Sequence, residues 1–195
     1  MHGSFPGEKR AATFGAFGGD VASRLVALVI VADAGVERRL EAGDLAYAYR
    51  TSRLKRRELG DVAVIQAELR IEHSTPAQAD GLVKALQAQR TRTQPRILSA
   101  GSVFANPDGT YAGKLIDEAG LKGTTAGRAA ISEQHANFIV NPGGATAADV
   151  YALVRRAQAT VYERTGIWLV PEIELFGRWT TEEREAVQPG VLSRG

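Results

Sequence analysis

The sequence predicts an α+β fold of one large or two small domains. Strand patterns concentrate before residue 73, and apolar residues recur at helical spacing in several stretches from residue 76 onward. The chain has 195 residues with 44% hydrophobic content, which is enough to bury a core. Gly, Pro, Asn and Thr become frequent after residue 92, which predicts a domain boundary near that position.

The strand predictions begin with residues 25–32, a continuous apolar run suited to a buried strand. Turn-forming residues at 33–35 separate this run from a more polar strand at 36–40, so the two strands form a predicted hairpin. Apolar and polar residues alternate from 61 to 72, which indicates a strand with one buried face and one solvated face. A further apolar run at 136–140 also has the length of a strand.

The first two helix predictions lie in the middle of the chain. Thr75 is a suitable N-cap for a helix over 76–90, whose apolar stripe includes Leu82 and Val83. A shorter helical pattern spans 112–119 and is followed by a glycine that would end it. Both segments therefore predict helices with clear ends.

The most regular helical pattern begins after Thr146. This residue and Asp149 have the spacing of a capping box, and apolar residues recur at helical spacing until Gly166. Two short strand patterns follow, at 167–170 and 173–176. The charged remainder of the chain has no apolar pattern, so we expect it to be disordered or peripheral.

Charge and composition exclude several classes of function. The net charge is only +2, and no aromatic residues interleave the basic stretches at 53–57 and 90–96, so nucleic-acid binding is not expected. The chain has no cysteine and three scattered His, so we expect no metal site and infer that redox chemistry would require a bound cofactor. The longest apolar run is too short to cross a membrane, and the N-terminus lacks the apolar core of a signal peptide. We therefore expect a cytoplasmic protein.

Five segments carry more specific sequence. They are Tyr-Arg-Thr-Ser at 49–52, Ala-Gly-Ser-Val-Phe-Ala-Asn-Pro at 100–107, Ala-Gly-Lys-Leu-Ile-Asp-Glu-Ala-Gly-Leu-Lys-Gly at 112–123, Ser-Glu-Gln-His-Ala-Asn-Phe-Ile-Val-Asn at 132–141, and Pro-Glu-Ile-Glu at 171–174. In this order they resemble the type II UDP-N-acetylenolpyruvoylglucosamine reductases, and the similarity covers residues 15–177. One segment alone would be weak evidence, whereas five in the same order make coincidence improbable.

The resemblance implies a flavoenzyme of peptidoglycan precursor synthesis. Such an enzyme takes hydride from NADPH onto FAD and transfers it to UDP-N-acetylglucosamine enolpyruvate, which yields UDP-N-acetylmuramate. The resemblance also implies that residues 1–91 and 166–195 form the remnant of an FAD-binding domain, with a peripheral tail at 178–195. Residues 92–165 would form an α+β substrate-binding domain.

Three positions match the catalytic residues of the family. Ser102 matches the proton donor, and a weakly acidic hydroxyl within hydrogen-bond reach can protonate a strongly basic carbanion. Arg50 matches an arginine that holds the substrate carboxylate, and Glu172 matches a carboxyl group that donates a hydrogen bond when protonated. Without the resemblance, Ser102 would be interpreted as a turn residue, Arg50 as a solvated charge and Glu172 as a strand-edge residue facing water.

The resemblance also nominates residues for substrate and cofactor binding. The substrate-binding candidates are Tyr49, Asn106, Lys122, His135 and Asn137. The flavin-binding candidates are Gly15, Ala16 and Gly18. Two of these residues have ordinary alternatives, because a lysine after a helix is commonly a surface residue and a histidine can simply serve the fold.

The sequence departs from the family pattern near its start and in one later loop. Much of the family's N-terminal flavin-binding region has no counterpart, and charged residues follow Pro6-Gly7 where the family has a glycine pair. Gly127 is followed by Arg128 where the family usually has a second glycine. The alternative is therefore an inactive fragment or a UDP-sugar binding module without flavin. The oligomeric state is left open.

Overall fold

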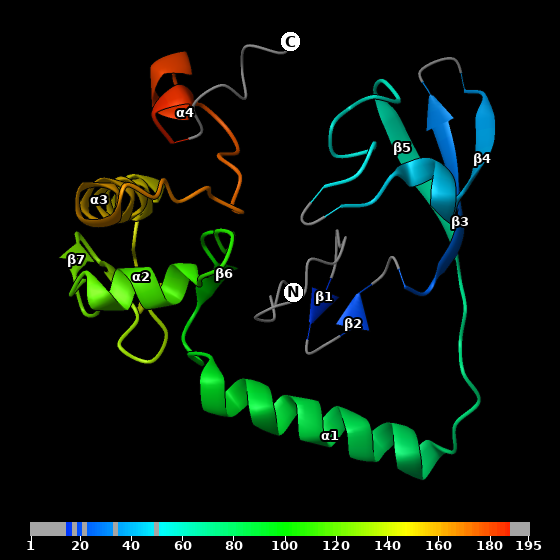
Figure 1. The fold of residues 1–195 in the computed structure, drawn as a ribbon, viewed down its shortest axis with the longest axis horizontal. Helices are drawn as coiled ribbons and strands as arrows, with labels where there is room; N and C mark the ends of the chain where they lie inside the picture. The colour runs from blue at the N-terminus through cyan, green and yellow to red at the C-terminus, as the bar shows by residue number, and fades with distance from the viewer. Residues whose placement is uncertain (1–14, 17–18, 21–22, 33–34, 49–50, 188–195) are drawn as a thin grey trace. The chain divides into compact units, whose positions relative to one another are not determined.

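The computed structural model describes residues 15–16, 19–20, 23–32, 35–48 and 51–187 (Figure 1). The chain divides between Val83 and Lys84 into two compact units. Both units contain helical turns and antiparallel strands, which confirms the α+β class. The division falls about eight residues before the predicted boundary near residue 92, inside a helix. In the described part of the chain, no helix is both long enough and apolar enough to cross a membrane.

The first unit contains a three-stranded antiparallel sheet with the strand order β4-β3-β5. Its strands are β3 (Leu25–Ala32), β4 (Glu37–Glu41) and β5 (Val62–Leu69). The β3–β4 pair confirms the predicted hairpin. A 3₁₀ turn, η1 (Ala42–Leu45), follows β4, and two short strands, β1 (Gly15–Ala16) and β2 (Gly19–Asp20), pair with each other.

The core of the first unit is built around β3, and the burial of β5 differs from the prediction. It consists of Leu25, Leu28, Ile30 and Leu45. The alternation in β5 predicted one buried face, but Ile65 and Leu69 are 52% and 50% exposed. A strand face is buried only where another element packs on it, and of the described β5 residues only Val62 packs against the core of this unit.

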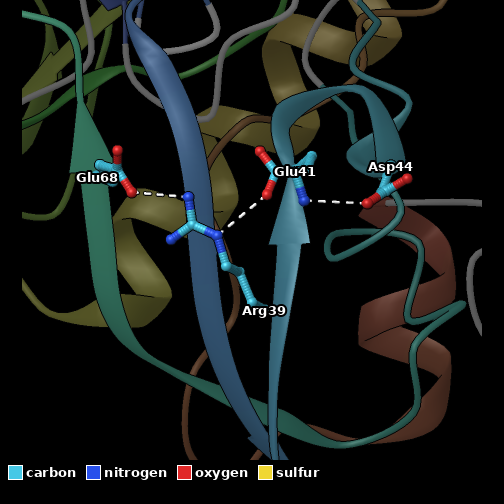
Figure 2. A network of polar contacts seen from close by, with 4 residues as sticks. All are labelled: Arg39, Glu41, Asp44 and Glu68. Atoms are coloured by element: carbon cyan, nitrogen blue, oxygen red, sulfur yellow. Dashed lines mark hydrogen bonds and ion pairs between the residues drawn. The ribbon is translucent and has the colours of Figure 1, made fainter.

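An exposed polar network crosses this sheet (Figure 2). Arg39 on β4 reaches across β3 to Glu68 on β5, with a 2.7 Å hydrogen bond, and also contacts Glu41 at 3.0 Å. The backbone N–H of Glu41 donates to Asp44 at the start of η1. Because all these side chains face solvent, the network adds little to stability.

A long exposed helix, α1 (Pro76–Thr93), joins the two units. The Thr75 hydroxyl accepts a 3.3 Å hydrogen bond from the Gln78 backbone N–H, which confirms the predicted N-cap. The apolar stripe is not buried, since Leu82 and Val83 are 62% and 50% exposed. The helix pattern was therefore predicted correctly, but the expected packing of its apolar stripe is absent from the described part of the chain.

The second unit contains a four-stranded antiparallel sheet with the order β6-β9-β8-β7. Its strands are β6 (Ser99–Ser102), β7 (Thr125–Ala126), β8 (Ala129–Ile131) and β9 (Phe138–Val140). Its helices are α2 (Ala112–Glu118), α3 (Ala147–Thr165) and α4 (Thr181–Val187). Buried apolar side chains from β8, β9, α2 and α3 form one continuous core.

Helix α3 confirms its predicted ends. Thr146 and Asp149 form the capping box, and Gly166 adopts the left-handed conformation with φ 69°. One face of the helix, including Leu153 and Val161, is fully buried. Local sequence therefore determines where this helix begins, where it ends and which face it buries.

The chain after α3 differs from the expected strands and peripheral tail. Residues 167–170 and 173–176 form no strand; Pro171 makes a single bridge to Phe104. Residues 181–187 form α4, and both Leu169 and Val187 are buried in the core of the second unit. We expected 166–195 to belong with the first domain, and its described part packs instead on the second unit.

Candidate active site

Ser102 lies at the end of β6, immediately after an irregular turn of the backbone. Gly101 has φ 81°, a conformation that favours glycine, and the pairing of β6 with β9 shifts in register between Ser99 and Ser102. Ser102 itself pairs with Phe138 and is only 9% exposed. The predicted proton donor is thus held on a strand end with little access for bulk water.

Glu172 lies on the segment that pairs with the backbone just after Ser102. Its backbone N–H donates a 2.8 Å hydrogen bond to the carbonyl of Val103, and the N–H of Ala105 donates to the carbonyl of Val170 at 2.8 Å. Both carboxylate oxygens of Glu172 are shielded from solvent. The fold therefore brings together two of the three predicted catalytic positions, although they are 70 residues apart in sequence.

Asn137, which directly precedes β9, also contacts the backbone just after Ser102. Its Oδ1 accepts from the N–H of Phe104 at 2.9 Å, and its Nδ2 donates to the carbonyl of Phe104 at 2.8 Å. Its own backbone carbonyl accepts from the N–H of Val103 at 2.8 Å. The side chain is buried, so these contacts are shielded from competing water.

Three of the predicted substrate-binding residues meet at the start of α2. Asn106 accepts a 3.1 Å hydrogen bond from the N–H of Ala112. At Gly113, an added Cβ would lie 3.2 Å from Cε1 of His135 and 3.5 Å from Cβ of Asn137. The missing side chain of Gly113 therefore allows this close approach. In the sequence, a glycine inside a helical pattern is the feature that could have indicated this close approach.

His135 lies beside this helix and is half-buried. Its Nδ1 accepts from the N–H of Asn137 at 3.2 Å, and its ring packs edge-on against Phe138 with centroids 4.8 Å apart. Burial lowers the pKa of His135, and the nearby charge of Lys122 lowers this pKa further. Since Nδ1 accepts a hydrogen bond, the neutral ring carries its proton on Nε2.

Lys122 follows α2 and forms an ion pair with Asp117. Its Nζ lies 2.6 Å from Oδ2 of Asp117, and the two side chains are 31% and 50% exposed. This is the surface position that a lysine after a helix commonly occupies. Its cation nevertheless lies close enough to lower the pKa of His135.

The loop with Gly127 and Arg128 supports the start of α3. Gly127 has φ 51°, and the N–H of Arg128 donates to Oδ2 of Asp149 at 3.3 Å. Hydrogen bonds from the N–H groups of Thr146 and Arg128 lower the pKa of the Asp149 carboxyl. Arg128 packs beside Gly144, which lies in the loop that leads into α3.

The remaining candidates lie largely beyond the described residues. Tyr49, Arg50 and Gly18 fall outside the part of the chain that the structure describes. Gly15 and Ala16 form β1. Among the described residues, no group of three or more His, Cys, Asp or Glu side chains could hold a metal ion.

Comparisons with known proteins agree with the resemblance. Residues 93–176 match the C-terminal domain of UDP-N-acetylenolpyruvoylglucosamine reductase. The chain is 41% identical over 165 residues to UDP-N-acetylenolpyruvoylglucosamine reductase 2 of Symbiobacterium thermophilum, a match that covers 84% of this chain and 52% of that protein. It is 44% identical over 167 residues to the reductase of Alkalilimnicola ehrlichii, covering 84% of this chain and 54% of that protein.

A solved structure has a similar fold. The crystal structure of UDP-N-acetylenolpyruvylglucosamine reductase from Thermus caldophilus matches with a TM-score of 0.71 and 35% sequence identity. The match covers 86% of this chain and 58% of that chain. The chain therefore spans about half the length of the curated relatives it matches.

Proposed function

Since this chain belongs to the UDP-N-acetylenolpyruvoylglucosamine reductase family, we propose that it takes part in the NADPH-dependent reduction of UDP-N-acetylglucosamine enolpyruvate to UDP-N-acetylmuramate. The observation that supports this proposal is the pairing of the Ser102 strand end with the Glu172 segment. A proton donor and a shielded carboxyl group thus lie on adjacent stretches of backbone.

The proposed task of Ser102 is to deliver a proton. When bound, FAD and NADPH supply the hydride that reduces the enol ether. Ser102 holds its proton on Oγ, within a site that admits little water, for the substrate carbon beside the carboxylate. A hydroxyl is a weak acid, but the negative charge that develops on that carbon makes it a strong base, so transfer over hydrogen-bond distance is feasible.

Glu172 and Arg50 are proposed to stabilise the charge that develops beside the substrate carboxylate. A protonated Glu172 carboxyl would donate a hydrogen bond to this carboxylate, and both of its oxygens are shielded from solvent. The planar guanidinium of Arg50 would hold the carboxylate with two hydrogen bonds. Both groups stabilise the transition state more than the bound substrate, which is the requirement for catalysis.

The residues proposed for the cofactor lie in the first unit, and most of those proposed for the substrate lie in the second. Asn106 and His135 lie at the start of α2 and Lys122 follows its end, and a cation and a histidine suit the diphosphate and hydroxyl groups of a UDP-sugar. Tyr49, which the resemblance also nominates for substrate binding, belongs to the first unit. The first unit, with Gly15, Ala16 and Gly18, would contribute to flavin binding, because glycine backbone permits a close approach to the flavin phosphates.

The decisive experiment separates the two halves of the reaction. We expect Ser102→Ala in the flavin-loaded chain to leave reduction by NADPH intact and to slow reoxidation by substrate by about 100-fold or more, since only reoxidation needs the proton. Stopped-flow absorbance of the flavin measures both rates. An equal loss of rate in flavin reduction and in flavin reoxidation would contradict the assigned role of Ser102.

A second candidate is a UDP-sugar binding module without flavin. It is favoured by one observation: the second unit has its own core and contains the residues at the start of α2. Titration of the purified chain with UDP-N-acetylglucosamine, together with its flavin spectrum after reconstitution, distinguishes the two. A colourless chain that binds the UDP-sugar would support the second candidate.

A further inference from the structure

The backbone that follows Ser102 is fixed at five successive polar groups. These are the N–H and carbonyl of Val103, the N–H and carbonyl of Phe104, and the N–H of Ala105. Asn137 provides three of the partners, and the segment with Val170 and Glu172 provides the other two. Two segments distant in sequence thus hold this short stretch from both sides.

The Asn137 side chain makes the most restrictive of these contacts. Its Oδ1 and Nδ2 engage the N–H and the carbonyl of one residue, Phe104, so they restrain the rotation of this backbone as well as its position. Asn137 is 4% exposed, and removal of its amide would leave two buried backbone groups without a hydrogen-bond partner.

We propose that Asn137 is a positioning residue, which acts through the backbone of Val103 and Phe104 to hold Ser102 in register with Glu172. Ser102 directly precedes Val103, and the Val103 carbonyl accepts from the N–H of Glu172. A rotation of this backbone therefore moves both groups at once. The inference rests on the proposed function of Ser102, and it replaces the expected contact of Asn137 with substrate.

The burial of Asn137 and the contacts that its amide already makes favour a positioning role over contact with substrate. A substrate ligand needs a polar group directed at the ligand, whereas both polar atoms of this amide contact the backbone of Phe104. Asn106, by contrast, is partly exposed beside the start of α2. The two asparagines are therefore expected to affect different kinetic constants.

The test compares Asn137→Ala with Asn141→Ala in the full chain. Asn141 is a matched control, because its side-chain amide also binds the backbone: its Oδ1 accepts the N–H groups of Gly143 and Ala145 in the loop after β9. We expect Asn137→Ala to lower the maximal rate of flavin reoxidation by about tenfold to 100-fold, with the apparent KM for substrate within about twofold of wild type. Asn141→Ala should leave both constants unchanged.

Hydrogen exchange provides a measurement that does not require flavin. In Asn137→Ala, the Phe104 amide proton should exchange at least about tenfold faster than in wild type, because its acceptor is gone. In Asn141→Ala it should exchange as in wild type. NMR or mass spectrometry of the purified chain measures this rate.

Three outcomes would overturn the inference. They are a raised KM with an unchanged maximal rate, equal slowing of flavin reduction and reoxidation, and unchanged exchange at Phe104. If the wild-type chain takes up no flavin, the proposed function fails on that observation. Exchange at Phe104 then decides by itself whether Asn137 fixes this backbone.

Discussion

His135 illustrates how the surroundings of a single residue set its protonation. The ring is half-buried, packs against Phe138 and lies near the ammonium group of Lys122. These surroundings lower its pKa, so the folded protein binds a proton on this ring less readily than the unfolded chain does. The sequence indicated a substrate contact or a structural histidine, and the neutral ring is compatible with both.

The stability of the protein should therefore depend on pH through His135. Since its folded pKa is depressed, its contribution to stability is fully present above the unfolded value of about 6.5 and is lost as pH falls through the folded pKa. We expect His135→Gln to remove this part of the pH dependence. Urea denaturation between pH 5 and pH 8, roughly the range in which His titrates, measures it.

His73 is the control for this measurement, because it is exposed in the segment between β5 and α1. His73→Gln should leave the pH dependence as in wild type. An equal change in both variants would show that the environment described for His135 does not set its protonation.

At the scale of an element, α3 depends on a loop that is distant from it in sequence. The capping box of Thr146 and Asp149 is local, but Asp149 also accepts the N–H of Arg128 from the turn between β7 and β8. Gly127 directly precedes Arg128 in this turn. An added Cβ at Gly127 would lie 2.2 Å from Oδ1 of Asp149. The turn must therefore approach the helix cap closely.

Gly127→Ala should destabilise the protein by about 2–3 kcal/mol, because it combines an unfavourable φ of 51° with a clash against the α3 cap. Gly109→Ala isolates the first effect, since Gly109 has φ 76° and no described atom within 4 Å of an added Cβ. We expect Gly109→Ala to lower the free energy of unfolding by about 1 kcal/mol. Denaturant midpoints measure the difference, and equal losses would argue against the close approach.

At the scale of the whole second unit, Gln158 connects three segments. Its Nε2 donates to the carbonyl of Leu169 at 2.9 Å and to the carbonyl of Val187 at 2.7 Å. The side chain is fully buried on α3, and Arg155 donates to its Oε1 at 3.1 Å. It therefore joins α3 both to the segment that leads to Glu172 and to the end of α4.

Gln158→Leu should cost about 2–4 kcal/mol in the free energy of unfolding, because it leaves two buried carbonyl groups without their donor. Urea denaturation followed by circular dichroism measures this loss. Gln87→Leu, at an exposed position of α1, is the matched control and should change stability by less than about 0.5 kcal/mol. A similarly small effect at Gln158 would contradict its connecting role.

Elements defined by neighbouring residues were predictable from the sequence. The β3–β4 hairpin, the N-cap at Thr75 and both ends of α3 follow from turn chemistry, capping side chains and the left-handed conformation of Gly166. Each depends on residues within a few positions of one another. The five motifs likewise indicated the family, which the comparisons support.

Only the tertiary structure decided which of these elements pack together. The strand patterns at 167–170 and 173–176 did not become strands, because this segment makes a single bridge to Phe104, and the expected tail contains α4. The hydrogen bond between the backbones of Glu172 and Val103 joins residues far apart in sequence, and so do the two hydrogen bonds of the Asn137 amide with Phe104. Such contacts depend on how the chain returns on itself, which local patterns of side chains do not specify.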